Sequence, residues 1–346
     1  MALDHDRYRI EWDPATLRLV SEKSVYARII RLHSGELLCC YQRGGQSRVK
    51  RSLDNGSTWD GEVLVTDYRH GIAANPELRQ LRDGRVLLCY NERPHSEGHP
   101  FSIMTVLSDD GGRTWGEAKR LFTAGLTKDD GCWEPVALQY PDGEVQVFFA
   151  NEKPYTETNE QEISMISSKK PSKVWTVSRR DNARDGMSVP CLLNDGKTVA
   201  MAIEDSRWND ERGRMKPVVL FSSTRQRWKE GRIDAVSKRR EYALKNELPP
   251  MTYLGAPYLV QMPTGITVLS SQLENAEGVQ QMVVYLGNEQ ARDFTSGSKP
   301  FSMAGAAASM WNSLFVKESN TVTAVSGTRI DGQSGIWIID GKITGQ

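Results

Sequence analysis

Apolar segments occur in pairs along the chain, and a short polar turn separates the two members of each pair. Each segment has the length of a β-strand, and turns such as Asp83-Gly84 and Asp142-Gly143 are typical of a chain reversal between antiparallel strands. The pattern occurs over residues 25–41, 73–90, 132–150, 186–203, 254–272 and 310–327. We therefore predict six antiparallel hairpins.

A shorter motif occurs twice between these hairpins. Residues 52–59 (SLDNGSTW) and 108–115 (SDDGGRTW) match at Ser, Asp, Gly, Thr and Trp in the same register. In such a corner the Asp binds backbone amides, the Gly adopts a positive φ and the Trp packs against the strands. Residues 168–175 and 221–228 end in Trp at the corresponding place but lack the Asp and Gly.

These two levels of repetition predict the fold. Six hairpins, four of them followed by such a corner or its remnant, are typical of a radial β-architecture. We predict an all-β, six-bladed β-propeller with four antiparallel strands per blade, formed by residues 1–346 as a single catalytic domain. Four hairpins have a proline near the start of the first strand, where we expect the missing N–H to cost little: Pro76, Pro135, Pro190 and Pro257.

Charge and composition exclude some partners. The chain has 44 Lys plus Arg and 44 Asp plus Glu, so no net charge favours nucleic acid or an anionic membrane. No apolar run approaches the roughly 20 residues of a membrane span, and residues 1–13 are too polar for a secretory signal. We expect a soluble chain, cytoplasmic as it stands and secreted or periplasmic if a leader has been removed.

Neither a metal nor a cofactor is predicted. The five cysteines lack metal-ligand spacing, and we expect them to be buried free thiols. His95 and His99 are closely spaced, but a loop that contacts substrate or water explains them better than a metal does.

The predicted topology brings strand ends together. In a propeller, the start of each first strand and the end of each second strand meet at one mouth of the central channel. The chemically active residues at these places are Arg28, Asn75, Glu92, Arg93, Trp133, Glu134, Asn151, Ser188, Glu204, Asp205, Trp311 and Arg329.

This set of residues favours sugar chemistry. Hydrolysis of a glycosidic bond uses a pair of carboxyl groups, and Glu134 and Glu204 come from adjacent repeats. Trp133 and Trp311 are candidate sugar platforms, and the other eight residues of the list are candidate substrate ligands. Structural explanations remain for each: a capped strand start for Glu134, a solvated loop for Glu204, and an internal ion pair for the buried Arg28.

The motifs resemble a known superfamily. The S-x-D-x-G-x-T-W corners are similar to the Asp-box, or BNR repeat, of sialidase-like propellers, and Arg28-Ile29-Ile30 is similar to the Arg-Ile-Pro opening of sialidases. Sialidases, however, bind the substrate carboxylate with three arginines and use a Tyr nucleophile, and neither is evident here. Blade five opens with residues 254–257 (LGAP) where an arginine is expected.

Trp133-Glu134-Pro135 and Glu204 resemble more closely the glutamate pair of the exo-arabinanases of glycoside hydrolase family 93. This resemblance implies a retaining exo-acting enzyme that releases short arabinose units, such as arabinobiose, from α-1,5-arabinan or a related plant or bacterial glycan. It leaves the acid/base and nucleophile roles of the two glutamates open. The alternatives are an exo-sialidase and a non-catalytic glycan-binding propeller.

Overall fold

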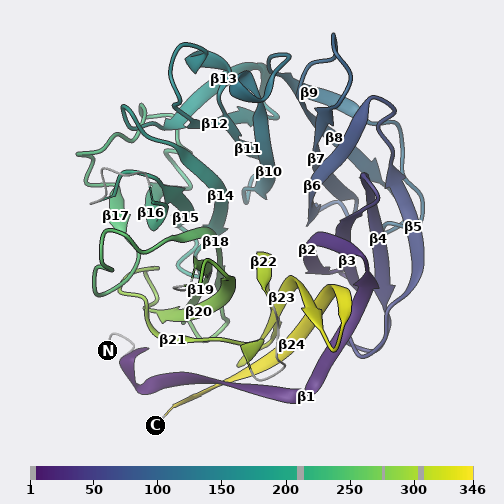
Figure 1. The fold of residues 1–346 in the computed structure, drawn as a ribbon, viewed down its shortest axis with the longest axis vertical. Helices are drawn as coiled ribbons and strands as arrows, with labels where there is room; N and C mark the ends of the chain where they lie inside the picture. Colours follow the sequence, from purple (N-terminus) through teal and green to yellow (C-terminus); the bar gives the residue numbers. More distant parts are fainter. Residues whose placement is uncertain (1–4, 209–213, 275–276, 303–307, 346) are drawn as a thin grey trace.

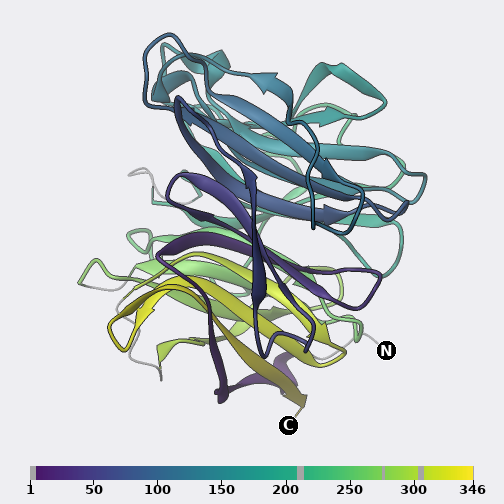
Figure 2. The ribbon, with the colours of Figure 1, turned by 90° about the vertical axis from the view of Figure 1, so that its right-hand side faces the viewer.

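Six four-stranded antiparallel sheets form a ring, as predicted (Figure 1). The computed structural model describes residues 5–208, 214–274, 277–302 and 308–345. Seen from the side, the strands run across the thickness of the ring (Figure 2). No helix within these described residues is long and apolar enough to cross a membrane. The three helices described are single 3-10 turns: η1 (His5–Arg7), η2 (Lys128–Asp130) and η3 (Lys153–Tyr155).

Five sheets follow the chain from their inner to their outer strand. Blades one and two contain β2 (Ser24–Arg31), β3 (Leu37–Arg43), β4 (Gln46–Ser52), β5 (Asp60–Thr66), then β6 (Gly71–Gln80), β7 (Val86–Pro94), β8 (Ser102–Ser108) and β9 (Lys119–Thr123). Blades three and four contain β10 (Cys132–Gln139), β11 (Val145–Asn151), β12 (Glu162–Ser167), β13 (Lys170–Ser178), then β14 (Asp185–Leu192), β15 (Thr198–Asp205), β16 (Lys216–Ser223) and β17 (Arg240–Tyr242). Blade five contains β18 (Leu254–Gln261), β19 (Thr267–Glu274), β20 (Gln280–Gly287) and β21 (Thr295–Ser298).

The sixth sheet closes the ring with strands from both ends of the chain. Its order is β22 (Ser309–Glu318), β23 (Thr321–Ile330), β24 (Gln333–Gly345) and β1 (Tyr8–Glu22), so the N-terminal strand is outermost. β1 runs antiparallel to β24, with Tyr8 opposite Gly345 (Figure 1). Pairing the two ends in one sheet holds the first and last blades together and removes the open edge that a linear array of sheets would leave.

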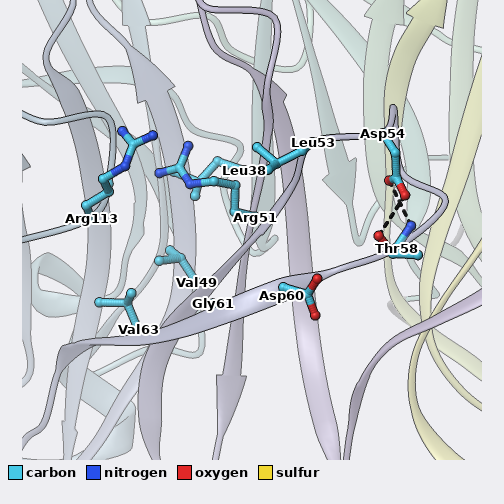
Figure 3. A pocket seen from close by; sticks show the side chains of 11 residues that line it. Leu38, Val49, Arg51, Leu53, Asp54, Thr58, Asp60, Gly61, Val63 and Arg113 are labelled. Carbon is cyan, nitrogen blue, oxygen red and sulfur yellow. Dashed lines mark hydrogen bonds between the residues drawn. The ribbon is translucent and has the colours of Figure 1, made fainter.

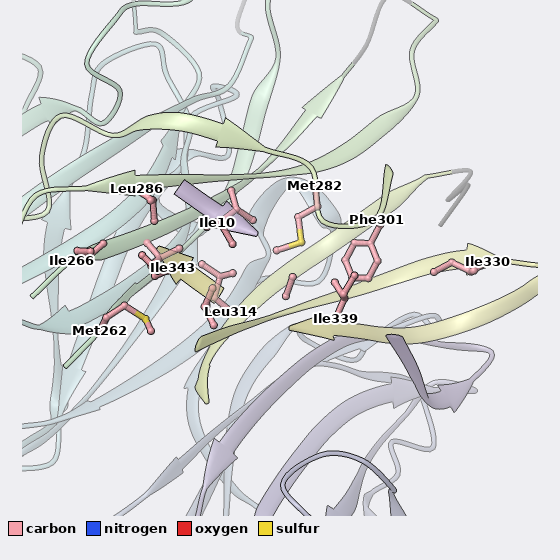
Figure 4. Close-up of a cluster of buried hydrophobic side chains, with 14 residues drawn as sticks. Ile10, Met262, Ile266, Met282, Leu286, Phe301, Leu314, Ile330, Ile339 and Ile343 are labelled. Atoms are coloured by element: carbon pink, nitrogen blue, oxygen red, sulfur yellow. The ribbon is translucent and has the colours of Figure 1, made fainter. Parts of the chain in front are cut away.

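Clusters of buried apolar side chains fill the interfaces between neighbouring blades. The cluster between blades five and six combines Ile10 of β1 with Met262, Met282, Leu314 and other residues (Figure 4). Comparable clusters lie at the other five interfaces. The hydrophobic core is therefore divided among the six blade interfaces, which explains why the apolar pattern repeats evenly along the sequence.

The repeated corners lie between the third and fourth strands of blades one and two. The Asp54 carboxylate accepts hydrogen bonds from the backbone N–H and the hydroxyl of Thr58, at 2.8 and 2.7 Å. Asp110 binds Thr114 in the same way, at 2.9 and 2.6 Å. Trp59 is buried beneath its corner, whereas Trp115 is partly exposed. Both corners thus have the geometry that the motif predicts.

An irregularity recurs in the inner strand of every sheet. Between two paired positions the inner strand advances three residues while its partner advances two, as from Gly186 to Val189 against Glu204 to Ala202. This is a β-bulge with one extra residue. In each bulge a non-glycine residue has φ between 46° and 55°: Tyr26, Asn75, Glu134, Met187, Ala256 and Trp311.

The bulges change the explanation for the prolines. Pro76, Pro135 and Pro257 each follow a bulge residue directly and have no ladder partner. Pro190 lies beyond the bulge in β14, which is the inner edge of its sheet. The missing N–H is tolerated because these are bulge or edge positions, and not because the ladder has barely begun.

The five cysteines are free thiols, as expected. Cys39, Cys40, Cys89 and Cys132 are buried, and Cys191 in β14 is partly exposed.

Candidate active site

The six bulge residues surround one end of the ring axis. Tyr26, Met187 and Ala256 come from blades one, four and five and form a buried apolar cluster with one another. Contact between blades on different sides of the ring shows that these side chains meet at the axis. Because a bulge re-aims a side chain, the bulge position places Glu134 beside this apolar floor.

A buried ion pair lies one step deeper along the inner strands. Arg28, two residues after Tyr26, is 1% exposed and donates from Nε to Glu77 at 2.9 Å. Tyr258 donates its hydroxyl to the other oxygen of Glu77 at 3.3 Å. The Arg28 guanidinium also lies 4.0 Å from the centre of the Tyr26 ring. Arg28 therefore supports the apolar floor, and its ion pair with Glu77 is the internal ion pair that the sequence left open as a structural explanation.

Glu204, at the end of β15, is partly exposed at the same mouth. Its Oε2 accepts a 2.7 Å hydrogen bond from the backbone amide of Ala256 in the next blade. Two neighbouring glycines leave room for this carboxyl group. A Cβ atom on Gly186 would lie 2.9 Å from Oε1 of Glu204, and one on Gly255 would lie 2.8 Å from Oε2. Burial, together with the negative charge of Glu134, raises the pKa of Glu204 to about 7.

Burial raises the pKa of Glu134 as well, although the positive charge of Arg93 and a hydrogen bond from the Met187 backbone act in the opposite direction. Because Glu134 acts on the pKa of Glu204, the two carboxyl groups are within electrostatic range of each other. The structure thus brings the two predicted glutamates together from adjacent blades.

Tyr253 stands next to this pair, just before β18. A Cβ atom on Gly255 would lie 2.6 Å from the Tyr253 hydroxyl and 2.8 Å from Oε2 of Glu204, so both groups border the same small space beside this glycine. Burial and the charges of Glu204 and Glu134 raise the pKa of its hydroxyl well above the usual range. Tyr253 is therefore a neutral hydroxyl beside the two glutamates.

A polar network borders Glu134 on the blade-three side. Trp133 donates its indole N–H to Glu152 at 2.9 Å. Arg184, in the loop between β13 and β14, forms an ion pair with the same carboxylate. Arg184 also donates to Gln161 at 2.9 Å. Trp133 packs edge-on against Phe101, with ring centres 5.1 Å apart, so it is held in place more firmly than a free sugar platform would be.

Arg93 and Asn75 come from blade two. Arg93 donates from Nη2 to Oδ1 of Asn75 and lies 4.8 Å above the Trp133 ring. Asn75 is a bulge residue, so its position in the mouth follows from the same backbone feature as that of Glu134.

The other predicted ligands differ in how well they can reach a substrate. Trp311 is 36% exposed, and its ring centre lies 6.3 Å from that of Tyr26, so it borders the open mouth. Arg329 is exposed at the end of β23. Ser188 is buried, and its hydroxyl has no hydrogen-bond partner among the described residues.

Three predicted ligands are engaged within the blades. Asp205 is fully buried and pairs with Arg240 at 2.6 Å. Asn151 is buried and donates to Ser164 at 3.0 Å. Glu92 is 7% exposed and lies 3.4 Å from a guanidinium nitrogen of Arg120. These contacts give each residue a structural role that sequence position alone did not indicate.

Several residues of the mouth were not among the candidates for chemistry. Tyr26, Met187 and Ala256 are ordinary apolar residues of inner strands, although their position at a strand start places Met187 and Ala256 at the mouth. Gly186 and Gly255 offered a signal, because a glycine within a strand often marks a close approach of another group. Both occupy the position directly before a bulge residue, on either side of Glu204.

A separate cavity of about 390 Å³ lies at the outer edge of blades one and two, near both repeated corners (Figure 3). Leu38, Val49, Leu53 and Val63 provide apolar walls. The guanidinium of Arg51, which faces it, already binds Glu36 and the carbonyl of Gly111. The cavity contains neither glutamate of the mouth, and it has no unpaired cation to attract a charged ligand.

Comparison with protein-family models and with curated proteins finds no match. Solved structures do match. A Penicillium chrysogenum α-L-arabinanase complexed with arabinobiose is 17% identical, with 99% of this chain and 98% of that chain covered and a TM-score of 0.72.

The GH93 α-L-arabinofuranosidase of Fusarium graminearum, in complex with arabinobiose, is 16% identical, with 93% of each chain covered and a TM-score of 0.68. A Hadza microbial sialidase is 14% identical over 93% of this chain and 66% of that one, with a TM-score of 0.63. At such identities the likeness establishes architecture, so the chain has the fold shared by GH93 arabinofuranosidases and sialidase-like propellers.

Proposed function

We propose that the chain is a retaining exo-glycoside hydrolase, a single catalytic domain over residues 1–346, which releases short arabinose units from α-1,5-arabinan or a related glycan. The observation that carries the proposal is the electrostatic coupling of Glu134 and Glu204 at one mouth. The bound arabinobiose of two proteins with the same fold supports the choice of sugar.

The environments of the two glutamates suggest their roles. Glu204, with a pKa of about 7, keeps a proton near neutral pH and acts as the general acid. It donates this proton to the glycosidic oxygen as the bond to the anomeric carbon breaks. Glu134, whose ionised form Arg93 and the Met187 amide favour, attacks that carbon and forms a glycosyl ester.

The second half of the reaction returns both groups to their starting states. Glu204, now ionised, takes a proton from a water molecule, whose oxygen attacks the anomeric carbon of the ester. The sugar leaves with the configuration it had in the substrate, and Glu134 is again a carboxylate. Retention requires the two carboxyl groups to be roughly 5–5.5 Å apart.

The shape of the mouth supports exo-action. Tyr26, Met187 and Ala256 meet at the axis, and Arg28 with Glu77 lies beneath them, so the channel is closed below the glutamates. A mouth that is closed below its catalytic groups would accept the end of a glycan and not its middle. Trp311 at the rim offers an exposed ring face for a sugar unit.

The test is hydrolysis of an aryl α-L-arabinofuranoside and of linear arabinan. We expect Glu134→Gln and Glu204→Gln to lose essentially all activity while still folding and unfolding cooperatively. Glu289→Gln, in an exposed turn, is the matched control and should retain full activity. A fully active Glu134→Gln would overturn the proposal.

Azide distinguishes the two roles. With an activated aryl glycoside, Glu204→Ala should be rescued by azide and yield a glycosyl azide, because the small anion needs no general base. That product should keep the anomeric configuration of the substrate, because azide attacks the glycosyl ester. Glu134→Ala should instead give a glycosyl azide of inverted configuration, because azide then enters from the face that the missing carboxylate occupied. An inverted product from Glu204→Ala and a retained one from Glu134→Ala would reverse the assignment.

The alternatives predict different outcomes. A sialidase needs three arginines around one carboxylate, and Arg28 is committed to Glu77. Hydrolysis of a sialyl substrate would nevertheless establish that activity, and binding without turnover of any glycan would indicate a recognition module.

A further inference from the structure

Arg93 is a guanidinium at the mouth whose hydrogen-bond partners are all neutral. It is partly buried at the end of β7 and donates to the amide oxygens of Asn75 and, at 3.4 Å, Asn91. One face of the guanidinium covers the ring of Trp133. Within the described residues Nη1 makes no hydrogen bond, and no carboxylate oxygen lies within 4 Å of Arg93.

Three other arginines near the axis or in the blade interiors are neutralised directly by an ion pair with a carboxylate: Arg28 with Glu77, Arg184 with Glu152, and Arg240 with Asp185. This is the usual arrangement, because a desolvated charge without a charged partner is costly. Arg93 departs from it. Burial lowers the pKa of Arg93, and the charge of Glu134, which acts from beyond contact distance, compensates only in part.

Arg93 lies among residues of the mouth, with Asn75 and Trp133 as its contacts. Trp133 and Asn75 hold the guanidinium in a fixed orientation, and the charge of Glu134 acts on it more strongly than that of any other carboxylate. A planar guanidinium with a free edge is suited to a carboxylate, which accepts two hydrogen bonds in the same plane. The site therefore combines hydrolytic carboxyl groups with a cation that lacks an anion.

We propose that Arg93 binds a carboxylate on the substrate, so that the glycan carries an acidic sugar next to the linkage that is cleaved. The position of the cleaved linkage rests on the proposed function, whereas the binding of a carboxylate by Arg93 does not depend on it. It favours an arabinose-bearing glycan with acidic units over linear arabinan, which is neutral.

Binding of matched sugars tests this directly. D-galacturonate and D-galactose differ only at C6, as do D-glucuronate and D-glucose, and each is titrated into the wild-type protein by NMR. We expect at least one uronate to bind at least about tenfold more tightly than its neutral partner, since a hydrogen bond to a charged group contributes that much. N-acetylneuraminate, as a further probe, tells whether the carboxylate belongs to a uronate or to a nonulosonate.

The variant Arg93→Gln should remove this preference and leave binding of the neutral sugar unchanged. Arg225→Gln is the matched control, because Arg225 is an exposed arginine in the turn after β16, outside the residues assigned to the mouth, and its loss changes the net charge equally. Equal binding of acidic and neutral sugars by the wild-type protein would overturn the proposal, whether or not the variant folds. So would an equal effect of the two substitutions.

The outcome is separable from that of the proposed function. Selective uronate binding that depends on Arg93, without hydrolysis, would support the carboxylate site and refute the hydrolase. Hydrolysis that depends on Glu134 and Glu204, without any preference for acidic sugars, would do the reverse.

Discussion

The backbone amide of Ala256 donates a 2.7 Å hydrogen bond to Oε2 of Glu204, which links the bulge of blade five to the second strand of blade four. The amide of the bulge residue Trp311 donates in the same way to Gln272 of blade five, at 3.1 Å. The bulge amide is thus a repeated donor directed at the preceding blade. In blade four its acceptor is a carboxyl group, and the hydrogen bond favours the ionised form.

The raised pKa of Glu204 predicts a pH dependence of stability. Its folded-state pKa of about 7 exceeds the ordinary value near 4.3, so its contribution is fully present below about pH 4 and is lost as the pH rises through about 7. Relative to Glu204→Gln, the wild-type protein should lose up to about 3 kcal/mol of unfolding free energy between pH 5 and pH 8. Urea unfolding at both pH values measures this. Parallel pH profiles of the two proteins would contradict it.

Gly186 should be needed for the position of Glu204. A Cβ at this residue would lie 2.9 Å from Oε1 of Glu204, so Gly186→Ala must displace the carboxyl group. We expect hydrolysis to fall by about 100-fold, the typical result of misplacing a catalytic group by about 1 Å. Gly327→Ala, at the position of β23 that corresponds to Glu204, meets nothing closer than 3.4 Å and should retain activity. Equal kcat/KM for the two variants would count against this role.

The ion pair of Arg28 and Glu77 should be structural. Arg28→Met leaves the Glu77 carboxylate buried without its partner, which we expect to cost about 3–5 kcal/mol of unfolding free energy. The double variant Arg28→Met with Glu77→Leu should recover most of that loss, because neither charge remains. Denaturant unfolding of all four members of the cycle measures the coupling. Additive effects would show that the two side chains do not depend on each other.

The corner at Asp110 should contribute to stability and not to activity. Its carboxylate accepts hydrogen bonds from the amides of Arg113 and Thr114, both at 2.9 Å, and these contacts lower its pKa. Asp110→Ala should lower the melting temperature by a few degrees at pH 7 and leave kcat/KM unchanged. Because a lowered folded-state pKa stabilises only above the unfolded value, the difference should shrink as the pH falls below about 4.

Asp109→Ala is the neighbouring control for this corner. Asp109 is exposed and has no hydrogen bond within the described residues, so its replacement should leave the melting temperature unchanged. Equal melting temperatures for the two variants would mean that the motif's Asp has no stabilising role.

Much of the fold could be predicted from local patterns. The hairpin at residues 186–203 is visible because each of its strands is an apolar run bounded by turn residues, and the same holds for the other five. The corners at residues 52–59 and 108–115 could be predicted in detail, since their hydrogen bonds join residues at most four positions apart.

The candidate site was predictable only in part. Glu134 and Glu204 could be placed at the mouth because both lie at strand ends, which the topology gathers on one face. Arg28 and Asp205 satisfied the same rule, yet each is paired with a partner in the interior, Glu77 and Arg240. Strand-end position predicts a neighbourhood, but it does not show which side chains find partners there.

The six hairpins, their closing corners and the face on which Glu134 and Glu204 lie follow from the chain's own local pattern, because they depend on residues close together in the chain. The apolar floor and the raised pKa of Glu204 arise only in the folded ring, because they depend on contacts between different blades, as of Tyr26 with Ala256 and of Ala256 with Glu204. No local pattern encodes the burial and charge that such contacts create.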